Sequence, residues 1–438
     1  MNAPLGQPES AEIVDMLVDG RGVAKTQGKT VFVHGAIKGE HVEFVRRKKR
    51  RNYDEAELTG ILQSAPERVA PRCEYFGICG ACALQHLDPS HQLELKQSVL
   101  LESLQRIGSV RPNRILDPIM GDVWGYRRKA RLAVKYVNRK GRVLVGFRER
   151  NKPFVADMSS CATLHPAIGE RIPDLIELIE GLSIRDRLPQ IEAVVGDNGV
   201  VMIFRVLSPP SADDMARFSA FRDASGVFVY LQAKGPESIV PLPGDPQPEE
   251  LFYTLPDFDI ALHFSPQDFL QVHAEVNRKM IEQAIVLLQP DRDKRVLDLF
   301  SGLGNFSLPI ATRAREVVGI ELARGTVERA RANAERAGLS NVFFHAADLT
   351  SPAAPADPVW RDFDLLVLDP PRTGALELME VIGTIGARRL LYVSCHPGTL
   401  ARDTQHLVHQ LGYDLDAVGV MDMFPHTSHV ESMALFRK

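Results

Sequence analysis

The apolar and polar positions follow different patterns in the first and the last part of the chain. From Glu12 to about Leu62, short apolar alternations are separated by glycines and show no helical period. From Gln271 onwards, a helical period over Val276–Leu288 leads into short apolar runs that alternate with helical stretches. The first pattern is typical of a small β-barrel, and the second favours a doubly wound, mostly parallel α/β sheet. We predict five strands in that sheet: Arg295–Leu299, Val317–Ile320, Val342–His345, Leu365–Leu368 and Leu390–Val393.

Between these two parts, one helix is clearly indicated. Apolar residues recur at helical spacing from His91 to Ile107, which predicts an amphipathic helix there. The stretch 120–250 mixes strand-like runs with connections rich in proline and glycine, and its pattern defines no element bounds. A chain of 438 residues is long enough for two or three domains.

Positive charge is concentrated in the first third of the chain. The net charge is only −4, but Arg46–Arg51 is an uninterrupted basic hexamer, which we expect on a loop or at the barrel rim. The stretch 106–150 holds thirteen Lys or Arg against three Asp or Glu, interleaved with the aromatic residues Trp124, Tyr126, Tyr136 and Phe147. A solvated charge run would explain the hexamer alone equally well. The second region favours a nucleic acid bound on one face.

The composition indicates a globular protein that is not associated with a membrane. The hydrophobic share of 45% and the charged share of 25% are ordinary for soluble proteins. Met1–Ser10 lacks a basic stretch followed by an apolar run, and no segment approaches the roughly 20 apolar residues of a membrane helix. We therefore expect a cytoplasmic protein with no membrane partner.

Glycines or acidic residues follow four of the predicted strands. The first strand leads into Phe300-Ser301-Gly302-Leu303-Gly304, where the glycines let the backbone turn tightly and approach a ligand. Glu321 ends the second strand, a place from which an acid binds ribose hydroxyls, while Asp348 follows the third strand and Asp369 the fourth. Ligands bind beyond the carboxyl ends of parallel strands, so these residues predict a nucleoside cofactor. The loop lacks a phosphate-binding pattern, and the acids suit a positively charged sulfonium.

The cysteines form a cluster and one isolated residue: Cys73, Cys79, Cys82 and Cys161, and then Cys395. An odd, sparse set without an export signal argues against disulfide bonds. The first four supply enough thiolates for a tetrahedral zinc ion or a cubane iron–sulfur cluster. Zinc ribbons usually contain two Cys-x2-Cys pairs, which this spacing lacks, but both metal centres remain open.

Cys395 follows the last predicted strand, at the edge where the cofactor is expected. A buried structural cysteine is the alternative, but the Ser394-Cys395-His396-Pro397 turn at this edge favours a nucleophile. Spacing alone does not distinguish Glu431, near the C-terminus, from an exposed surface acid.

Three segments together resemble the motifs of the RNA uracil-5-methyltransferase family: Asp298-Leu299-Phe300-x-Gly-x-Gly-Asn305-Phe306, Ser394-Cys395-x-Pro397 and His429-x-Glu431-Ser432. The resemblance extends over almost the whole chain. It implies Cys395 as the nucleophile that adds to C6 of uracil, and Glu431 as the base that later removes the C5 proton. It also implies S-adenosyl-L-methionine as cofactor, with contacts from Gln271, Phe300, Asn305, Glu321, Asp348 and Asp369.

The N-terminal part resembles the ribosomal RNA branch of this family, which implies a [4Fe–4S] cluster on Cys73, Cys79, Cys82 and Cys161. The implied parts are an OB-like TRAM barrel at 10–68, a central iron–sulfur α+β domain at 69–90 and 120–262, and the Rossmann-like methyltransferase domain at 91–119 and 263–438. The implied partner is 23S ribosomal RNA, methylated at uridine 1939 to give 5-methyluridine. We expect no obligate protein partner.

Three departures from the family pattern leave the nucleophile, the base and the cofactor acids in place. Ser301 stands where several relatives have Cys, Pro371 where some have Ala, and His396 where Asn is common. His396 lies next to the expected nucleophile and could alter its surroundings.

Other functions compete with this interpretation. A transfer-RNA uracil-5-methyltransferase would use the same chemistry, but that branch generally lacks the barrel and the cluster, and another uridine of 23S RNA is a further possibility. An adenine amino-methyltransferase would share the Pro-Pro motif, yet Arg372 stands where an aromatic residue should stack on the base. A non-catalytic iron–sulfur RNA-binding protein is the rival from a different class, and the presence of both Cys395 and Glu431 weighs against it.

Overall fold

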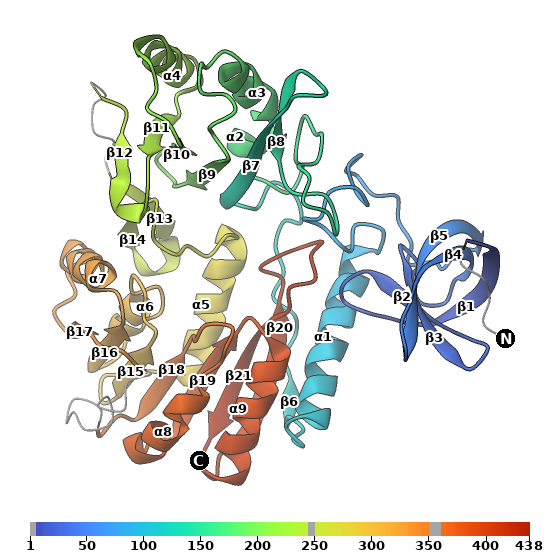
Figure 1. Cartoon of the computed structure of the whole chain (residues 1–438). Helices are drawn as coiled ribbons and strands as arrows, with labels where there is room; N and C mark the ends of the chain where they lie inside the picture. The colour runs from blue at the N-terminus through green and yellow to red at the C-terminus, as the bar shows by residue number, and fades with distance from the viewer. Residues whose placement is uncertain (1–5, 244–249, 350–360) are drawn as a thin grey trace.

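The computed structural model describes residues 6–243, 250–349 and 361–438. Its N-terminal part is a closed five-stranded barrel with the strand order β1-β2-β3-β5-β4 (Figure 1). Inward-facing side chains such as Val31, Val33 and Phe44 fill its interior. The predicted small barrel is therefore confirmed. Its strands are β1 (Pro8–Met16), β2 (Arg21–Thr26), β3 (Lys29–His34), β4 (His41–Lys49) and β5 (Tyr53–Gln63).

Four residues of the basic hexamer lie in a strand, so the prediction of a loop is wrong for them. Residues 46–49 end β4, and Lys49 pairs with Asp54 of β5. Arg46 is only 2% exposed, and its guanidinium donates to Asp54 Oδ2 at 2.5 Å and to Glu9 Oε1 at 2.8 Å. These two carboxylates compensate the buried charge, which lets the strand continue through the basic run. The other five residues of the hexamer are exposed.

The barrel is followed by the cysteine segment, residues 71–86, and by helix α1 (Pro89–Arg106). The barrel approaches this segment so closely that a Cβ on Gly20 would lie 2.2 Å from the carbonyl oxygen of Ala83, and Gly20 has a φ of +84°. Only glycine fits there. The predicted helix over 91–107 is confirmed and begins two residues earlier, where Asp88 caps it by accepting a hydrogen bond from Ser90 N at 2.9 Å.

The stretch for which the sequence defined no bounds forms a six-stranded sheet of order β12-β11-β10-β9-β7-β8. Helices α3 and α4 pack on it around a core of their own. A separate hairpin, β13–β14, leads from this sheet towards the C-terminal part. The elements are β7 (Lys129–Val137), β8 (Arg142–Gly146), α2 (Pro166–Gly169), α3 (Ile172–Glu180), β9 (Gln190–Val195), β10 (Val200–Arg205), α4 (Ala212–Ser225), β11 (Phe228–Gln232), η1 (Pro236–Ser238), β12 (Ile239–Pro241), β13 (Leu251–Leu255), η2 (Pro256–Phe258) and β14 (Ile260–Phe264).

The C-terminal part is an eight-stranded sheet of order β17-β16-β15-β18-β19-β21-β20-β6. All five predicted strands are present, and β17, β16, β15, β18 and β19 pair in parallel. The prediction missed β6, β20 and β21, of which β21 pairs antiparallel with both β19 and β20. The elements are β6 (Arg114–Ile115), α5 (Ala274–Leu288), β15 (Arg295–Leu299), α6 (Ser307–Ala311), β16 (Glu316–Glu321), α7 (Arg324–Arg336), β17 (Val342–Ala346), β18 (Leu365–Leu368), η5 (Leu376–Leu378), α8 (Met379–Ile385), β19 (Arg389–Ser394), α9 (Pro397–His409), β20 (Asp414–Met421) and β21 (Glu431–Arg437).

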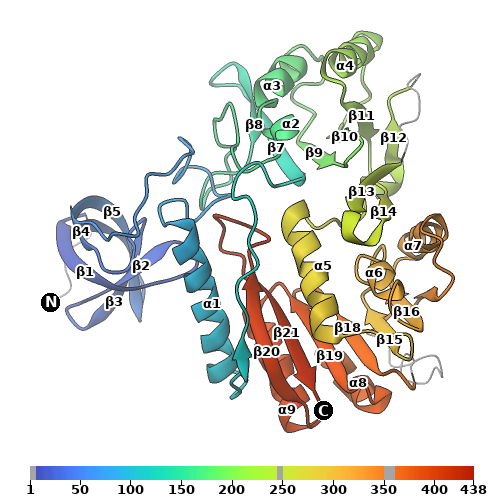
Figure 2. The same cartoon turned by 180° about the vertical axis from the view of Figure 1, so that it is seen from behind.

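Helices cover both faces of this sheet, as a doubly wound fold requires. Alternate residues of β15 face opposite cores: Val296 packs with α5, α6 and α7, whereas Leu297 and Leu299 pack with α1, α8 and α9. Figures 1 and 2, seen from opposite sides, show α5 on one face and α8 and α9 on the other. Among the described residues, no helix is both long and apolar enough to span a bilayer.

Candidate active site

Four predicted site residues meet at one edge of the C-terminal sheet. The strands β16, β15, β18 and β19 are neighbours and run in parallel, so their carboxyl ends lie side by side. Glu321 ends β16, Phe300 follows β15, Asp369 follows β18, and Cys395 follows β19. This is the edge at which open α/β sheets bind their ligands.

The glycine loop after β15 is tied to the acid that ends β16. Gly302 N donates to Glu321 Oε2 at 3.2 Å, and Ala323 N donates to Glu321 Oε1 at 3.1 Å. Phe300 and Gly302 have φ angles of 65° and 55°, which fold the loop back over the strand end. The Glu321 carboxylate is thus held by backbone amides at the mouth of the loop.

Asn305 has protein partners that the sequence did not reveal. Its Oδ1 accepts hydrogen bonds from Tyr253 OH at 2.9 Å and from Asn277 Nδ2 at 3.0 Å. Its Nδ2 donates in return to Asn277 Oδ1 at 2.9 Å. These bonds fix Asn305 between the β13–β14 hairpin and α5, beside the glycine loop.

Of two further predicted cofactor residues, Asp348 belongs to this edge and Gln271 lies in the loop before α5. Gln271 is half-buried in the loop before α5, next to Phe269, which is 78% exposed. Asp348 is exposed, two residues beyond the end of β17. Because Ala346 at that end pairs with Glu321, Asp348 belongs to the same edge of the sheet.

The buried acids of this edge favour a cation. Burial raises the pKa of Asp369 to about 7, and it raises the pKa of Asp298 to about 7 as well, with a further contribution from the Asp369 and Glu321 charges. Ser307 Oγ donates to Asp298 Oδ2 at 2.5 Å, while Asp298 Oδ1 is buried without a hydrogen-bond partner among the described residues. A positively charged ligand would favour the ionised form of both acids. Asp298 was part of the sequence motif but was not among the predicted contacts.

The expected nucleophile and the expected base are direct neighbours across two strands. Ser394 of β19 pairs with Ser432 of β21, and Cys395 and Glu431 are the next residues on the two chains, close enough for the Glu431 charge to act on the Cys395 thiol. Burial raises the pKa of the Cys395 thiol, the Glu431 charge raises it further, and Arg372 opposes the shift. Burial together with the Asp369 charge raises the pKa of Glu431 to about 8. A carboxyl group with a pKa in this range exchanges protons readily near neutral pH.

Arg372 and His429 complete the surroundings of this pair. Arg372 donates to His429 Nδ1 at 2.9 Å, and the His429 ring stacks on Phe424 with centroids 4.6 Å apart. Burial and the nearby Arg372 charge lower the pKa of His429 to about 4, so its ring is a neutral acceptor. From the sequence, Arg372 was noted only as the residue that replaces an aromatic.

His396, which stands next to the expected nucleophile where relatives commonly have Asn, caps a helix. Its Nδ1 accepts a hydrogen bond from Thr399 N at 3.2 Å and thereby caps α9, which begins at Pro397. An asparagine caps helices in the same way, which explains why either residue fits this position.

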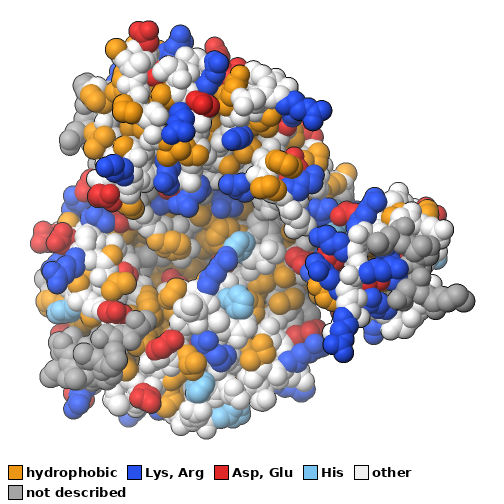
Figure 3. Space-filling view, viewed as in Figure 1, with side chains coloured by type: hydrophobic (Ala, Val, Ile, Leu, Met, Phe, Trp, Pro, Cys, Tyr) orange, Lys and Arg blue, Asp and Glu red, His pale blue; other side chains and the backbone are white. Residues whose placement is uncertain are grey.

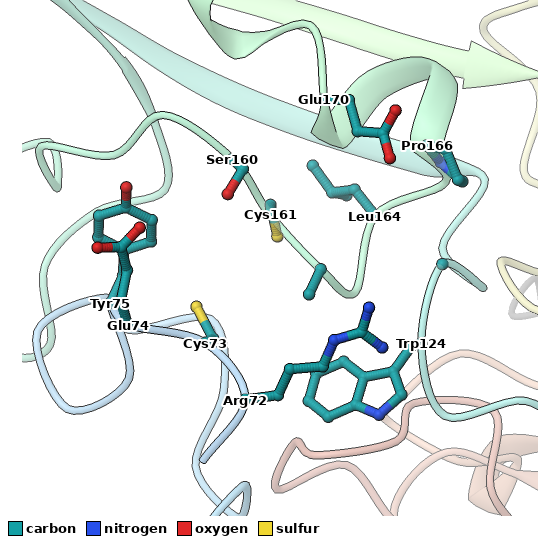
Figure 4. Close-up of a pocket in the computed structure, with 12 residues that line it drawn as sticks. Arg72, Cys73, Glu74, Tyr75, Trp124, Ser160, Cys161, Leu164, Pro166 and Glu170 are labelled. Atoms are coloured by element: carbon teal, nitrogen blue, oxygen red, sulfur yellow. The ribbon is translucent and has the colours of Figure 1, made fainter.

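The four clustered cysteines come from two separate segments and lie near one another. Cys73 and Cys161 both point into a cavity of about 500 Å³ that Arg72 and Trp124 also line (Figure 4). Burial raises the pKa of Cys79 to about 11 and that of Cys82 to about 12, and the Cys161 charge adds to both shifts. All five cysteines are free thiols. Within the described ranges, however, no three His, Cys, Asp or Glu side chains are arranged closely enough to hold a metal ion.

A mostly parallel sheet with acids, a cysteine and a glutamate at its carboxyl edge has the arrangement of a Rossmann-like methyltransferase, and the comparisons with known proteins agree. The family model described as tRNA (Uracil-5-)-methyltransferase matches residues 252–438. The 23S rRNA (uracil(1939)-C(5))-methyltransferase RlmD of Alkalilimnicola ehrlichii is 53% identical over 434 residues, which cover 99% of this chain and 97% of that protein. The RlmD of Stenotrophomonas maltophilia is 48% identical, with 98% and 97% covered. The chain belongs to the family of S-adenosylmethionine-dependent RNA uracil-5-methyltransferases.

A solved structure supports the fold as a whole. The crystal structure of Pyrococcus abyssi tRNA (uracil-54, C5)-methyltransferase in complex with S-adenosyl-L-homocysteine aligns with a TM-score of 0.73 at 23% identity. The alignment covers 97% of this chain and 100% of the other.

Proposed function

We propose that this protein methylates C5 of uridine 1939 in 23S ribosomal RNA through a covalent bond from Cys395. The observation that carries the proposal is the Cys395–Glu431 pair at the acidic edge of the sheet, together with 53% identity to a 23S rRNA uracil(1939) methyltransferase over nearly the whole length. The substrate RNA lies in the cytoplasm, where we place the protein.

The cofactor site is proposed at the carboxyl edge. S-adenosyl-L-methionine supplies an electrophilic methyl group on a positive sulfonium. Asp369 and the neighbouring Asp298 favour that charge, and Glu321, held by two backbone amides, is available to the ribose hydroxyls. We assign the remaining contacts to Gln271, Phe300, Asn305 and Asp348.

The chain's own residues then carry out two steps. The Cys395 thiolate adds to C6 of the uracil, which places the electron pair of the C5–C6 double bond on C5, and C5 takes the methyl group. Glu431 removes the proton from C5, the C5–C6 double bond re-forms, and the C6–S bond breaks to regenerate the thiolate. Arg372 opposes the rise in the pKa of both Cys395 and Glu431 and so favours the anionic forms that these steps need.

The RNA surface is proposed on the basic side of the molecule. In Figure 3, Lys and Arg side chains gather beside the hollow between the central and the C-terminal sheets and on the barrel side that faces it. The five exposed residues of the basic hexamer lie at the end of β4 and in the turn after it. Such a surface binds phosphates, and the target base must leave its stack to reach Cys395.

We further propose that Cys73, Cys79, Cys82 and Cys161 hold a [4Fe–4S] cluster. Support comes from the four free thiols and from the cavity that Cys73 and Cys161 both face. Zinc is the alternative metal. With this cluster, the barrel would be a TRAM domain at 10–68, followed by an iron–sulfur domain (69–90, 120–262) and the methyltransferase domain (91–119, 263–438).

Mapping 5-methyluridine in RNA tests the proposed function. A bacterial strain that lacks this protein should lose 5-methyluridine at position 1939 of its 23S RNA and keep it in transfer RNA. Wild-type protein should restore the modification, and Cys395→Ala should not. Loss of the modification from transfer RNA, with 23S RNA unchanged, would establish the transfer-RNA alternative instead.

A further inference from the structure

The loop between β20 and β21, residues 422–430, leads directly into Glu431 and is called the base loop here. Lys96 Nζ of α1 donates to Asp422 Oδ1 at 2.7 Å and to the Phe424 carbonyl at 3.0 Å. Tyr126 OH donates to the Pro425 carbonyl at 3.1 Å. The first half of the base loop is thus held by buried groups from other parts of the chain.

His426, the next residue of the base loop, is contacted from three other parts of the chain. Its backbone N donates to Gln92 Oε1 at 3.0 Å, and its ring Nδ1 lies 3.2 Å from Gln92 Nε2, which also donates to the Leu84 and Leu87 carbonyls. Its carbonyl accepts two hydrogen bonds from the cysteine segment, from Ala83 N at 2.8 Å and from Leu84 N at 3.0 Å. The Trp124 ring stacks on its imidazole with centroids 4.1 Å apart. Helix α1, the cysteine segment and the start of the central part therefore meet at this residue, the cysteine segment at its backbone carbonyl.

The backbone of His426 shows that these contacts constrain the base loop. Its φ of 65° lies in the left-handed region, which a residue with a Cβ adopts rarely. Such a conformation persists only where the surroundings determine it, and it is common beside active sites. A glycine would relieve the strain but would lose the ring contacts with Gln92 and Trp124. A residue at this position must therefore tolerate the left-handed backbone and also carry a side chain that reaches Gln92.

We propose that His426 is a positioning residue for the methyl transfer, which joins the cysteine segment and α1 to the base loop and thereby fixes the Glu431 carboxyl beside Cys395. This inference rests on the proposed function, because it assigns Glu431 to proton removal. Glu431 follows His426 by five residues, so freedom at His426 is transmitted directly to the base. Addition of Cys395 to C6 and methylation of C5 come before Glu431 removes the C5 proton. Proton removal alone should therefore become slow.

The test is a steady-state and single-turnover comparison on full-length protein with an RNA fragment that contains the target uridine. His426→Ala should lower kcat about tenfold or more, the order of effect expected for a displaced catalytic group, with the KM for RNA unchanged. It should also accumulate a methylated RNA–protein adduct that survives denaturation. His426→Asn should restore turnover, because asparagine tolerates the left-handed region and its amide lies where the ring Nδ1 does.

A matched control separates positioning from a general loss of stability. Tyr413→Phe removes one buried hydrogen bond, from Tyr413 OH to the Ala387 carbonyl at 2.7 Å, at the opposite end of β20. This variant should lose thermal stability without accumulating adduct. Gln92→Met removes the contacts that Gln92 makes with His426 and also its hydrogen bonds to the Leu84 and Leu87 carbonyls. If His426→Ala does not fold, Gln92→Met should accumulate the adduct in its place.

The outcomes separate this inference from the proposed function. An RNA that carries 5-fluorouridine should trap the wild type covalently, and a wild type that forms no adduct would overturn the proposed function and this inference together. The other informative result is a wild type that is trapped, while the variants at 426 and 92 slow every step equally and accumulate no methylated adduct. That result would overturn the positioning role alone.

Discussion

The buried acids of the cofactor edge predict that S-adenosylmethionine binds more tightly as the pH rises. Burial raises the pKa of Asp369 to about 7, so without a ligand this carboxyl is ionised in about one molecule in ten at pH 6 and in about nine in ten at pH 8. A cofactor that requires the ionised form should therefore show a dissociation constant about tenfold lower at pH 8 than at pH 6. Binding should also release protons, since the sulfonium favours the carboxylate.

Calorimetry in two buffers of different ionisation enthalpy measures both quantities. S-adenosylhomocysteine is the matched control ligand, because it lacks only the methyl group and the positive charge and should depend less on pH. In the cofactor-free protein, the raised pKa has the opposite effect on stability. The folded state binds this proton more tightly than the unfolded chain, so stability falls as the pH rises from the ordinary aspartate range through about 7. Equal pH dependence for the two ligands would refute the reasoning.

Three further predictions concern the cofactor edge, the base loop and the cysteines. Glu321→Ala should weaken cofactor binding without changing the circular dichroism spectrum, and unchanged affinity by calorimetry would remove Glu321 from the site. Lys96→Met breaks a buried ion pair with Asp422, whose two side chains are 1% and 3% exposed, and should cost about 3–5 kcal/mol in urea unfolding; an unchanged midpoint would show that the pair contributes nothing. Protein purified without oxygen should be brown and carry about four irons per chain, whereas stoichiometric zinc without visible absorbance would decide for a zinc site.

The elements predicted from the sequence are those whose pattern is local. The five parallel strands are continuous apolar runs between helices, and each was found at or near its bounds. The run from Met433 to Phe436 is equally apolar, but nothing in it indicates an antiparallel strand between β19 and β20. In the central sheet, β7 pairs with β9, which lies more than 50 residues further along the chain, and no local pattern shows such a pairing. Arg46 was misplaced because the carboxylates of Glu9 and Asp54 lie on other strands.

The same distinction applies to the site. Acids and a cysteine at strand ends could be predicted to meet, because parallel strands bring their carboxyl ends to one edge. The contacts that hold the base loop could not be predicted from the sequence. Lys96 and Asp422 are 326 residues apart, and Gln92 and His426 are 334 residues apart. A lysine or glutamine on an amphipathic helix gives no sign that it is buried until its partner is known.

The most direct test of the account compares Cys395→Ala with Glu431→Gln on a uridine-containing RNA, followed by denaturing electrophoresis. Glu431→Gln should accumulate a methylated RNA–protein adduct, because addition and methylation proceed while proton removal stalls. Cys395→Ala should form no adduct and transfer no methyl group, because C5 is then never activated. A denaturation-resistant complex formed by Cys395→Ala would contradict the account, since another residue would then be the nucleophile.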